Sequence, residues 1–399
     1  MAEWIEKSLG EIAEVTKLAG FEFTKYIKYI DNGEIIALRA LNLRNGELDL
    51  SDIKRISRKV SEGLTRSKIY KDDILLTYTG NGYGDCAIIE ENDKYHLAPN
   101  ICKIVPNQDV IFPYYLYCYI SSNAFYNQMS NNMTGSGQPT IPMKTIRLLK
   151  IPVPDMSVQI KIANIIQSLN HKIRNNKVIN NNLLEQALTV FSTQFAALDR
   201  NGCIGDYCSV KSGFAFKSSW WTTNGVKVIK IGSINQDNLN LSECSYVDED
   251  KVDKAKDFKV IAGDLLIAMT GATIGKFAMV PYSSDTLLVN QRVGKFFLGN
   301  NPVEKLPFIY CTLKQPDVYY EIVNRGQGSA QPNISASDIM SISCVIPSKE
   351  AINKFNKTLQ PLFDLIISNQ RENQQLSTLR DSLLPKLMSG ELDVSDIDL

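Results

Sequence analysis

The chain repeats itself with a period of about 190 residues. Ala37–Leu50 aligns with Val228–Leu241, and Lys71–Gly80 aligns with Ala262–Gly271, both at an offset of 191 residues. Several matches in the same order at one offset are hard to produce by chance. Each copy is also far larger than the unit of a solenoid, which is about 20–50 residues long. The sequence therefore predicts two similar modules, each large enough to bury a core of its own.

A second match joins two loops that are rich in Gly, Ser, Gln and Pro. Gly135–Ile141 (GSGQPTI) and Gly328–Ile334 (GSAQPNI) are identical at five of seven positions, at an offset of 193. Pro154 and Pro347 match at the same offset. Each copy thus ends with the same kind of loop and then a proline, after which the sequence pattern changes.

Within each copy we expect strands mixed with short helices. Ile35–Leu43 and Asp73–Tyr78 are apolar runs with β-branched and aromatic residues, bounded by Gly, Asn and Asp, as is typical of strands. Tyr114–Phe125 and Leu306–Tyr320 contain aromatic residues at helix-like spacing. This mixture predicts an α+β module of about 150 residues.

After each copy the apolar pattern acquires a seven-residue period. The seam positions are Ile162, Ile166, Leu169, Ile173, Asn176, Asn180, Leu183, Ala187 and Val190 in the first stretch, and Phe355, Leu359, Leu362, Ile366, Asn369, Asn373, Leu376, Arg380 and Leu383 in the second. This period, sustained over four heptads, predicts long coiled-coil helices. Pro361 and Pro385 weaken the second helix, and Pro361 could kink it near its start.

Two asparagines occupy each seam near its midpoint. A polar residue at a seam position costs stability but fixes register and orientation. If the helices pair antiparallel about a pseudo-twofold axis, Asn176 faces Asn373 and Asn180 faces Asn369. The alternative is that these asparagines are merely exposed. A first helix about 55 Å long, at about 1.5 Å per residue, would hold one module at each end of such a pair.

The expected fold class is α+β: two similar mixed α/β domains separated by long antiparallel coiled-coil helices, with pseudo-twofold symmetry. Because the two domains differ in sequence, whatever they bind should differ as well. The expected boundaries are residues 1–155 for the first domain, 156–198 for the first helix and spacer, 199–348 for the second domain, and 349–399 for the second helix and tail.

The charge balance argues against a protein that coats nucleic acid by bulk charge, because 43 basic and 43 acidic side chains cancel. One segment, Ile53–Lys71, is nevertheless basic and contains a single acidic residue, Glu62. This segment is either a solvated face of the first domain or a set of contacts to phosphate groups.

The eight cysteines are scattered and form no C-x-x-C pair, and the chain has only two histidines. This pattern favours reduced, mostly buried thiols of a cytoplasmic protein and gives no metal site. No run of about 18 uncharged apolar residues occurs, so no membrane span is expected. The first residues also lack the pattern of a secretion signal.

Several motifs recur in a fixed order. Gly263–Leu266 (GDLL) is followed by Thr270–Gly275 (TGATIG), and a Gly-Ser-x-Gln-Pro loop occurs at Gly135–Pro139 and again at Gly328–Pro332. Leu383–Glu391 (LLPKLMSGE) lies near the end of the chain. In this order, doubled, the motifs make nearly the whole chain resemble the specificity subunits of Type I restriction–modification systems. The first copy departs from the pattern, with TGNGYG at Thr79–Gly84.

The resemblance implies a DNA specificity subunit. Each domain would be a target-recognition domain that reads one half of a bipartite, asymmetric target in double-stranded DNA. The helices would set the unread spacer and dock two methyltransferase (modification) subunits, and the complex would recruit restriction subunits, which are ATP-dependent translocases and endonucleases.

No catalytic site is expected in the chain itself. It lacks the Asn/Asp-Pro-Pro-aromatic motif of an adenine amino-methyltransferase, a Gly-rich cofactor loop and a G-x-x-x-x-G-K-[ST] phosphate loop, so we expect no cofactor. Thr270–Gly275 is best interpreted as a tight turn between strands. The alternative function is a non-enzymatic two-domain scaffold that binds other proteins, and a third is an enzyme whose site is not recognised.

Candidate DNA contacts are loop residues with hydrogen-bond donors, acceptors or positive charge. They are Arg39, Arg66, Thr79, Asn81, Tyr83, Gln138 and Lys144 in the first domain, and Lys217, Lys230, Thr270, Thr273, Lys276, Arg292 and Gln331 in the second. The two glutamines could equally hold their loops together. Trp220 and Trp221 are expected in the core rather than as a platform for bases.

Overall fold

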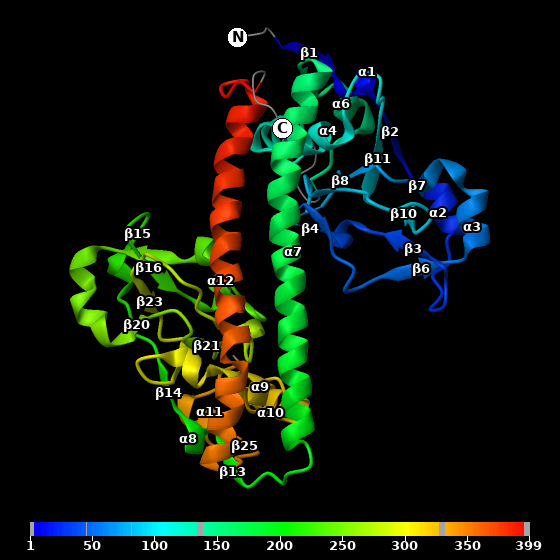
Figure 1. Cartoon of the computed structure of the whole chain (residues 1–399). Helices are drawn as coiled ribbons and strands as arrows, with labels where there is room; N and C mark the ends of the chain where they lie inside the picture. Colours follow the sequence, from blue (N-terminus) through cyan, green and yellow to red (C-terminus); the bar gives the residue numbers. More distant parts are fainter. Residues whose placement is uncertain (1–3, 45, 81, 134–138, 327–331, 395–399) are drawn as a thin grey trace. The chain divides into compact units, whose positions relative to one another are not determined.

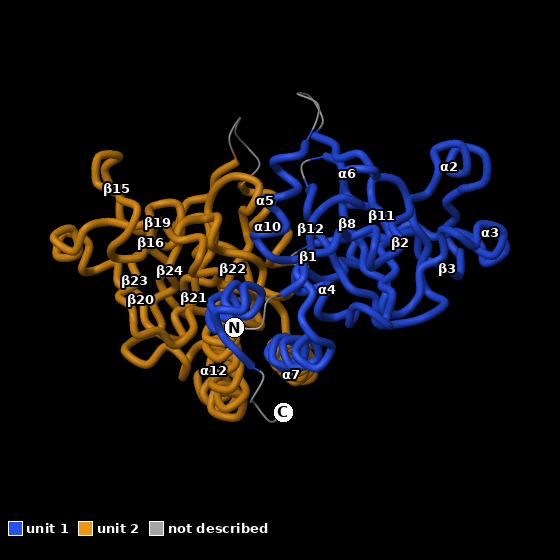
Figure 2. Tube along the Cα trace, turned by 90° about the horizontal axis from the view of Figure 1, so that it is seen from above, with its two compact units in different colours: residues 1–171, 377–399 blue, residues 172–376 orange. Residues whose placement is uncertain are grey.

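The computed structural model describes residues 4–44, 46–80, 82–133, 139–326 and 332–394 (Figure 1). The chain divides into two compact units (Figure 2). Unit 1 consists of Met1–His171 and Ser377–Leu399, and unit 2 is Lys172–Leu376.

Unit 1 contains two sheets. The first has the order β2-β11-β8-β9 and is antiparallel throughout, with strands β2 (Ala13–Lys17), β11 (Ile101–Pro106), β8 (Ile74–Thr77) and β9 (Cys86–Ile88). The second has the order β6-β3-β10-β7, in which β3 and β10 are parallel, with strands β6 (Lys54–Ile56), β3 (Ile35–Leu38), β10 (Tyr95–Leu97) and β7 (Lys68–Ile69).

Unit 2 repeats this topology and adds one strand at the edge of its second sheet. Its first sheet has the order β14-β24-β21-β22, with strands β14 (Ser209–Ser212), β24 (Val293–Phe297), β21 (Leu265–Ala268) and β22 (Phe277–Met279). Its second sheet has the order β15-β19-β16-β23-β20, with strands β15 (Trp221–Thr222), β19 (Ser245–Val247), β16 (Val226–Ile229), β23 (Leu287–Val289) and β20 (Lys259–Val260). The prediction of two similar mixed α/β domains is confirmed.

Each aromatic segment that the sequence suggests as one helical stretch forms two helices. Unit 1 has α4 (Pro113–Ile120) and α5 (Asn123–Asn131), and unit 2 has α9 (Leu306–Leu313) and α10 (Pro316–Gly326). The Ser122 hydroxyl accepts a hydrogen bond from the Phe125 backbone N–H and so caps α5. Pro316 begins α10, where its missing N–H costs nothing.

Shorter elements complete the units. Unit 1 also has β1 (Ile5–Ser8), α1 (Leu9–Ile12), α2 (Gly20–Tyr26), β4 (Leu43–Arg44), β5 (Glu47–Leu48), α3 (Arg58–Gly63), α6 (Met143–Leu148) and β12 (Lys150–Val153). Unit 2 also has β13 (Gly202–Cys203), α8 (Ile204–Tyr207), β17 (Ile234–Asn235), β18 (Asn238–Leu239), α11 (Ala336–Met340) and β25 (Ser343–Cys344).

The two long helices are α7 (Met156–Phe195) and α12 (Lys349–Met388), each 40 residues long. Each begins two residues after its proline, Pro154 or Pro347. The helix α12 continues through Pro361 and Pro385, so the expected kink does not end or divide it. Pro361 is exposed, so water can reach the carbonyl that its missing N–H leaves unpaired.

The helices pair antiparallel, as unit 2 alone establishes. Asn176 Nδ2 donates to Asn373 Oδ1 at 2.9 Å, and Asn369 Nδ2 donates to Asn180 Oδ1 at 2.8 Å. The residue number thus rises along α7 as it falls along α12. Asn176, Asn180 and Asn369 are buried, so the alternative of merely exposed side chains does not describe them.

Both long helices belong to the core of each unit. In unit 1, Ile166 of α7 and Leu387 of α12 are buried in one hydrophobic cluster. In unit 2, Phe191 of α7 packs against Phe355 of α12 with the ring centroids 5.7 Å apart. The two repeated modules are therefore not independent of the helices, because each core is completed by helical residues far away in the sequence.

A repeated buried ion pair joins the two sheets of each unit. Lys103 Nζ, on β11, lies 3.8 Å from Asp73 Oδ2 and donates to the Lys68 carbonyl on β7 at 2.6 Å. In unit 2, Lys295 Nζ, on β24, lies 2.6 Å from Asp264 Oδ2. Burial raises the pKa of both aspartates, and the lysines oppose that shift. The lysine ammonium offsets the cost of burying each carboxylate.

All eight cysteines lie in the described part of the chain, where none forms a disulfide and seven are buried. Among the described helices, none combines the length and apolar character needed to cross a bilayer.

Candidate nucleic-acid interface

In unit 2, two repeated motifs that are far apart in the sequence meet at one end of the first sheet. Thr270–Gly275 is the turn between the antiparallel strands β21 and β22, as interpreted from the sequence. The Gly271 N–H donates to the Pro332 carbonyl at 3.0 Å, and the Ile334 N–H donates to the Met269 carbonyl at 3.0 Å. The turn is therefore bound to the end of the Gly-Ser-x-Gln-Pro loop.

Unit 1 has the same arrangement. The Gly80 N–H donates to the Pro139 carbonyl at 2.9 Å, and the Ile141 N–H donates to the Tyr78 carbonyl at 3.0 Å. We call each arrangement a turn–loop junction. Junction 1 consists of residues 78–80, 82–84 and 139–141, and junction 2 consists of residues 269–275 and 332–334.

Glycines explain why both turns have the same backbone although their sequences differ. Gly80 and Gly84 have φ values of 86° and 88°, and Gly271 and Gly275 have 73° and 82°. Other residues rarely adopt this left-handed conformation. The N–H of Gly84 or Gly275 also closes each turn onto the preceding strand. TGNGYG and TGATIG thus keep glycine where the turn needs it.

An aromatic side chain that sequence reasoning did not single out supports each turn. A Cβ atom on Gly84 would lie 2.8 Å from Tyr126 Cδ2, and one on Gly275 would lie 3.5 Å from Tyr319 Cε2. Tyr126 and Tyr319 are 193 residues apart, the same offset as the two Gly-Ser-x-Gln-Pro loops, so the repeat could have pointed to both tyrosines. In junction 1, Tyr83 also stacks on Tyr126, with centroids 5.2 Å apart and the hydroxyls 2.6 Å apart.

Positively charged side chains flank junction 1. Lys17 Nζ lies 5.2 Å from the centre of the Tyr78 ring, and Arg66 Nη2 donates to the Lys17 carbonyl at 3.3 Å. Arg147, on α6, donates to the Val15 carbonyl at 2.6 Å, and the exposed Lys144 lies on the same helix. Lys17 and Arg147 are absent from the residues expected from the sequence.

At the equivalent places in unit 2 the side chains are different. Ser212 occupies the strand position of Lys17, and its hydroxyl lies 3.8 Å from the sulfur of Met269, the counterpart of Tyr78. The residue directly before β11 or β24 contributes a carbonyl to the same place in both units, Asn100 in unit 1 and Arg292 in unit 2. Both of these residues are exposed. The two units therefore share the backbone hydrogen bonds at this place, whereas the exposed side chains differ.

The hydroxyls of the candidate threonines are mostly engaged or covered. Thr79 is buried, and its hydroxyl lies 2.7 Å from that of Thr140. The Thr273 hydroxyl is 3.5 Å from the Thr270 carbonyl. The Thr270 hydroxyl is buried and has no hydrogen-bond partner among the described residues. Half-buried Lys276 directly follows the turn, and Asn81, Gln138 and Gln331 lie outside the described residues.

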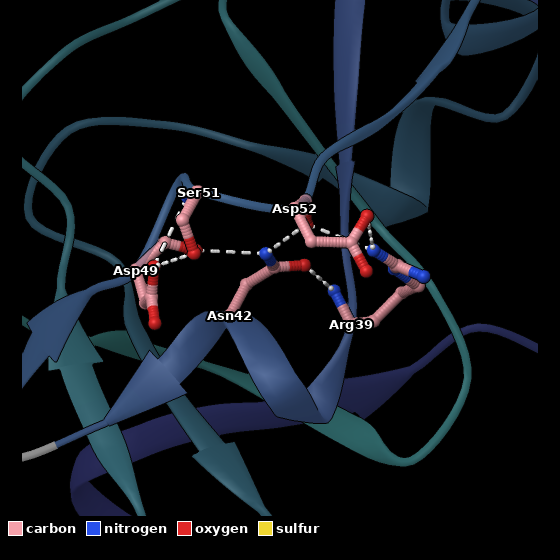
Figure 3. Close-up of polar contacts among 5 residues, drawn as sticks. All are labelled: Arg39, Asn42, Asp49, Ser51 and Asp52. Carbon is pink, nitrogen blue, oxygen red and sulfur yellow. Dashed lines mark hydrogen bonds and ion pairs between the residues drawn. The ribbon is translucent and has the colours of Figure 1, made fainter. Parts of the chain in front are cut away.

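Arg39 lies in a separate polar network (Figure 3). Its Nη2 donates to the Asp52 carbonyl at 2.8 Å and lies 3.1 Å from the Asp52 carboxylate. Asn42 links the same segments, because its amide accepts from the Arg39 N–H and donates to the carbonyls of Asp49 and Asp52. The Arg39 guanidinium is thus already bound within the protein.

The two lysine candidates early in unit 2 lie against tryptophan rings. Lys230 Nζ is 3.6 Å from the centre of the Trp221 ring, and burial lowers its pKa. Lys217 Nζ lies 5.8 Å from the centre of the Trp220 ring. Both tryptophans are half-buried and pack against the hydrophobic cluster that contains Phe216.

The described residues contain no group of three or more His, Cys, Asp or Glu side chains suited to a metal ion. His96 is buried, with Nδ1 2.9 Å from the Leu97 carbonyl, and burial lowers its pKa. What the junctions offer is a rigid backbone with variable polar, aromatic and basic side chains, which suits binding rather than covalent chemistry.

Known proteins agree with this architecture. A family model described as "Type I restriction modification DNA specificity domain" matches residues 1–185 and again residues 200–378. The specificity subunit of the Type I restriction enzyme HindI from Haemophilus influenzae is 23% identical, over 98% of this chain and 100% of that protein. The MjaIX specificity subunit from Methanocaldococcus jannaschii is 26% identical, over 99% and 95%.

A solved structure has the same fold. The S subunit of a Type I restriction–modification system from M. genitalium superposes with a TM-score of 0.57 at 16% sequence identity, covering 96% of each chain. The family model matches both copies of the repeat and most of the chain. The chain therefore belongs to the specificity subunits of Type I restriction–modification systems.

Proposed function

We propose that each recognition domain reads a different half of a bipartite, asymmetric target in double-stranded DNA, and that the junctions lie at the two reading surfaces. The observation that carries this proposal is the doubled turn–loop junction, with one backbone and two sets of exposed side chains. We assign recognition to residues 1–155 and 199–348, and spacing to residues 156–198 and 349–399.

The differences between the junctions support unequal half-sites. Base recognition depends on side chains with specific donors and acceptors, whereas phosphate contacts position the protein on any sequence. Asn100 can both donate and accept, whereas its counterpart Arg292 only donates. Arginine commonly donates two hydrogen bonds to guanine in the major groove. Arg292 is therefore our first candidate for base recognition, and Lys17, Arg66 and Lys144 are candidates for phosphate contacts.

The long helices are proposed to dock two methyltransferase subunits. Val178 and Ile179 on α7 and Leu365 on α12 are exposed and apolar, with 52%, 43% and 46% of their surface accessible. Exposed apolar side chains on a helix whose seam is already buried are suited to a protein partner. The complex so formed would in turn recruit ATP-dependent restriction subunits. We further propose that the chain acts in the cytoplasm, where such a complex meets DNA.

We propose that the chain itself is not a catalyst and needs no cofactor. Its junctions are backbone turns, with tyrosines in junction 1 and basic side chains beside it. The methyl group would come from the methyltransferase subunits. The alternative, a scaffold that binds proteins but not nucleic acid, is not favoured, because both copies of the repeat match a DNA specificity domain.

The test is methylation mapping. The chain is co-expressed with its methyltransferase, and the purified complex is incubated with S-adenosylmethionine and genomic DNA before methylated adenines are mapped by sequencing. We expect two different short half-sites at a fixed spacing. In an Arg292→Ala complex, discrimination should fall in one half-site only, while Lys144→Ala weakens methylation of all targets alike. A stable complex that methylates no bipartite target would refute the proposal.

A further inference from the structure

The β17–β18 hairpin of unit 2 is bound to the long helix α12. Gln370 Nε2, on α12, donates to the carbonyl of Asp237 in the hairpin turn at 3.1 Å. One helical turn further on, Gln374 Nε2 lies 3.4 Å from the Leu239 carbonyl. Two side chains of the spacer helix thus contact the backbone of one recognition-domain hairpin.

The carboxylate of Asp237 gathers further contacts. It accepts a hydrogen bond from the Tyr310 hydroxyl on α9 and forms an ion pair with Lys314, the residue that follows α9. Gln236 Nε2 also donates to it at 3.0 Å, and the Asp237 N–H donates to the Phe277 carbonyl on β22 at 3.0 Å. Asp237 therefore connects the hairpin, the first sheet, the aromatic helix and, through its carbonyl, the spacer helix.

The first copy of the repeat has only part of this arrangement. Gly46, 191 residues before Asp237, occupies the turn of the β4–β5 hairpin, and its carbonyl accepts a hydrogen bond from the Tyr117 hydroxyl at 2.7 Å. Tyr117 is 193 residues before Tyr310. Glycine has no carboxylate, and Ser121 stands where the second copy has Lys314. The charged contacts are thus an addition to a tyrosine–hairpin contact that both copies share.

We propose that Asp237 is a positioning residue that locks α12 to the second recognition domain, and that this lock makes the complex strict about the length of the DNA spacer. The inference rests on the proposed function, since it specifies how one half-site is held at its distance. The β17–β18 hairpin would then help to set the distance between the two half-sites, together with the helix seam.

The geometry of DNA explains why such a lock matters. One extra base pair between the half-sites shifts the second half-site by about 3.4 Å and rotates it by about 35°. A recognition domain can follow that movement only by turning on the helix. Charge-assisted hydrogen bonds are directional and about twice as strong as neutral ones, so Tyr310 and Lys314 hold the Asp237 turn firmly on α9. The hairpin carbonyls that Gln370 and Gln374 bind are thereby fixed to the domain, and these two bonds to α12 oppose the turn.

The test uses the full chain in its methyltransferase complex. Asp237→Gly removes the carboxylate but keeps a residue that tolerates the positive φ of 64° and keeps the carbonyl that Gln370 binds. Methylation is measured on DNA with the mapped target and on DNA whose spacer is one base pair longer or shorter. We expect the preference for the correct spacer to fall about tenfold, equivalent to about 1.4 kcal/mol.

Two further variants separate positioning from general damage. Asp237→Asn keeps an acceptor for Tyr310 and should retain most of the preference, whereas Gln370→Ala cuts the helix contact without altering the hairpin and should reduce it. Asn235→Ala changes an exposed residue of the same hairpin and should have no effect. If Asp237→Gly lowers methylation equally on all three spacer lengths, the inference is overturned. Such a result would mean that the variant is less active in general but has the same preference for spacer length.

A second readout does not depend on DNA. Amide hydrogen exchange of the β17–β18 hairpin should accelerate in Asp237→Gly and in Gln370→Ala, and stay unchanged in Asn235→Ala. Unchanged exchange in both lock variants would refute the lock itself. If exchange accelerates but the wild-type complex has no bipartite target, the proposed function fails while the hairpin contact stands.

Discussion

The buried pair of Asn180 and Asn369 allows a double-mutant cycle. We expect each single variant to be less stable than the wild type, whereas the double variant should not be. Each residue is only 8% exposed, and a 2.8 Å hydrogen bond joins the two side-chain amides across the helix seam. Replacing either one by leucine leaves the other amide buried without its partner, which costs about 1–3 kcal/mol. The new leucine recovers part of this loss by burying apolar surface. We expect each single variant to lower the free energy of unfolding by roughly 1 kcal/mol.

The double variant Asn180→Leu/Asn369→Leu contains no unpaired amide at this place and brings two leucines together. We expect it to be at least as stable as the wild type, so the coupling energy is about 2 kcal/mol, within the range found for residues in contact. Urea-induced unfolding of the four proteins measures this energy. The matched control is Asn181→Leu at an exposed position of the same helix. Single variants whose effects simply add in the double variant would refute the reasoning.

Three other predictions concern the cores and a turn. Phe355→Ala should lower the free energy of unfolding by about 3–5 kcal/mol in urea titrations, because this 1% exposed ring packs in the core that the long helices share. Burial keeps the pKa of His96 below 6.5, so an unfolded chain takes up a proton there first and the folded state loses stability as the pH falls below about 6.5. Unfolding measured at pH 7.5 and 5.5 should differ less in His96→Asn than in the wild type. Gly84→Ala should disturb junction 1 and impair one half-site in methylation mapping, because its Cβ would lie 2.8 Å from Tyr126, whereas Gly63→Ala meets nothing within 4 Å and should not.

The sequence predicted the duplicated architecture because the features that encode it are local and doubled. The period of seven residues predicts a coiled-coil helix wherever it occurs. The asparagines interrupt that period at 176, 180, 369 and 373. Antiparallel pairing about a pseudo-twofold axis brings Asn176 opposite Asn373 and Asn180 opposite Asn369, as the structure shows. The glycines of the turns were likewise visible as residues that repeat at a fixed offset.

The side chains around the junctions could not be predicted because tertiary contacts select them. Lys17 reaches Tyr78 only because β2 and β8 both pair with β11, a fact of sheet order that no local pattern contains. Arg39 looked like a free cation, but Asp52, thirteen residues later, binds its guanidinium. The loop that brings Asp52 back to Arg39 is held by hydrogen bonds from the Asn42 side chain to the carbonyls of Asp49 and Asp52. These bonds form only when the loop is folded.

The way the junction is built explains how one fold could read different targets. Its defining bonds run from backbone N–H to backbone carbonyl, at Gly80 to Pro139 and at Gly271 to Pro332. Backbone bonds make few demands on the neighbouring side chains, apart from glycine where φ is positive. The strand position of Lys17 can therefore be lysine or serine, and that of Tyr78 can be tyrosine or methionine, without altering the turn. A scaffold fixed by its backbone leaves recognition free to change, which is the property that a protein needs if its two halves must read unlike sequences.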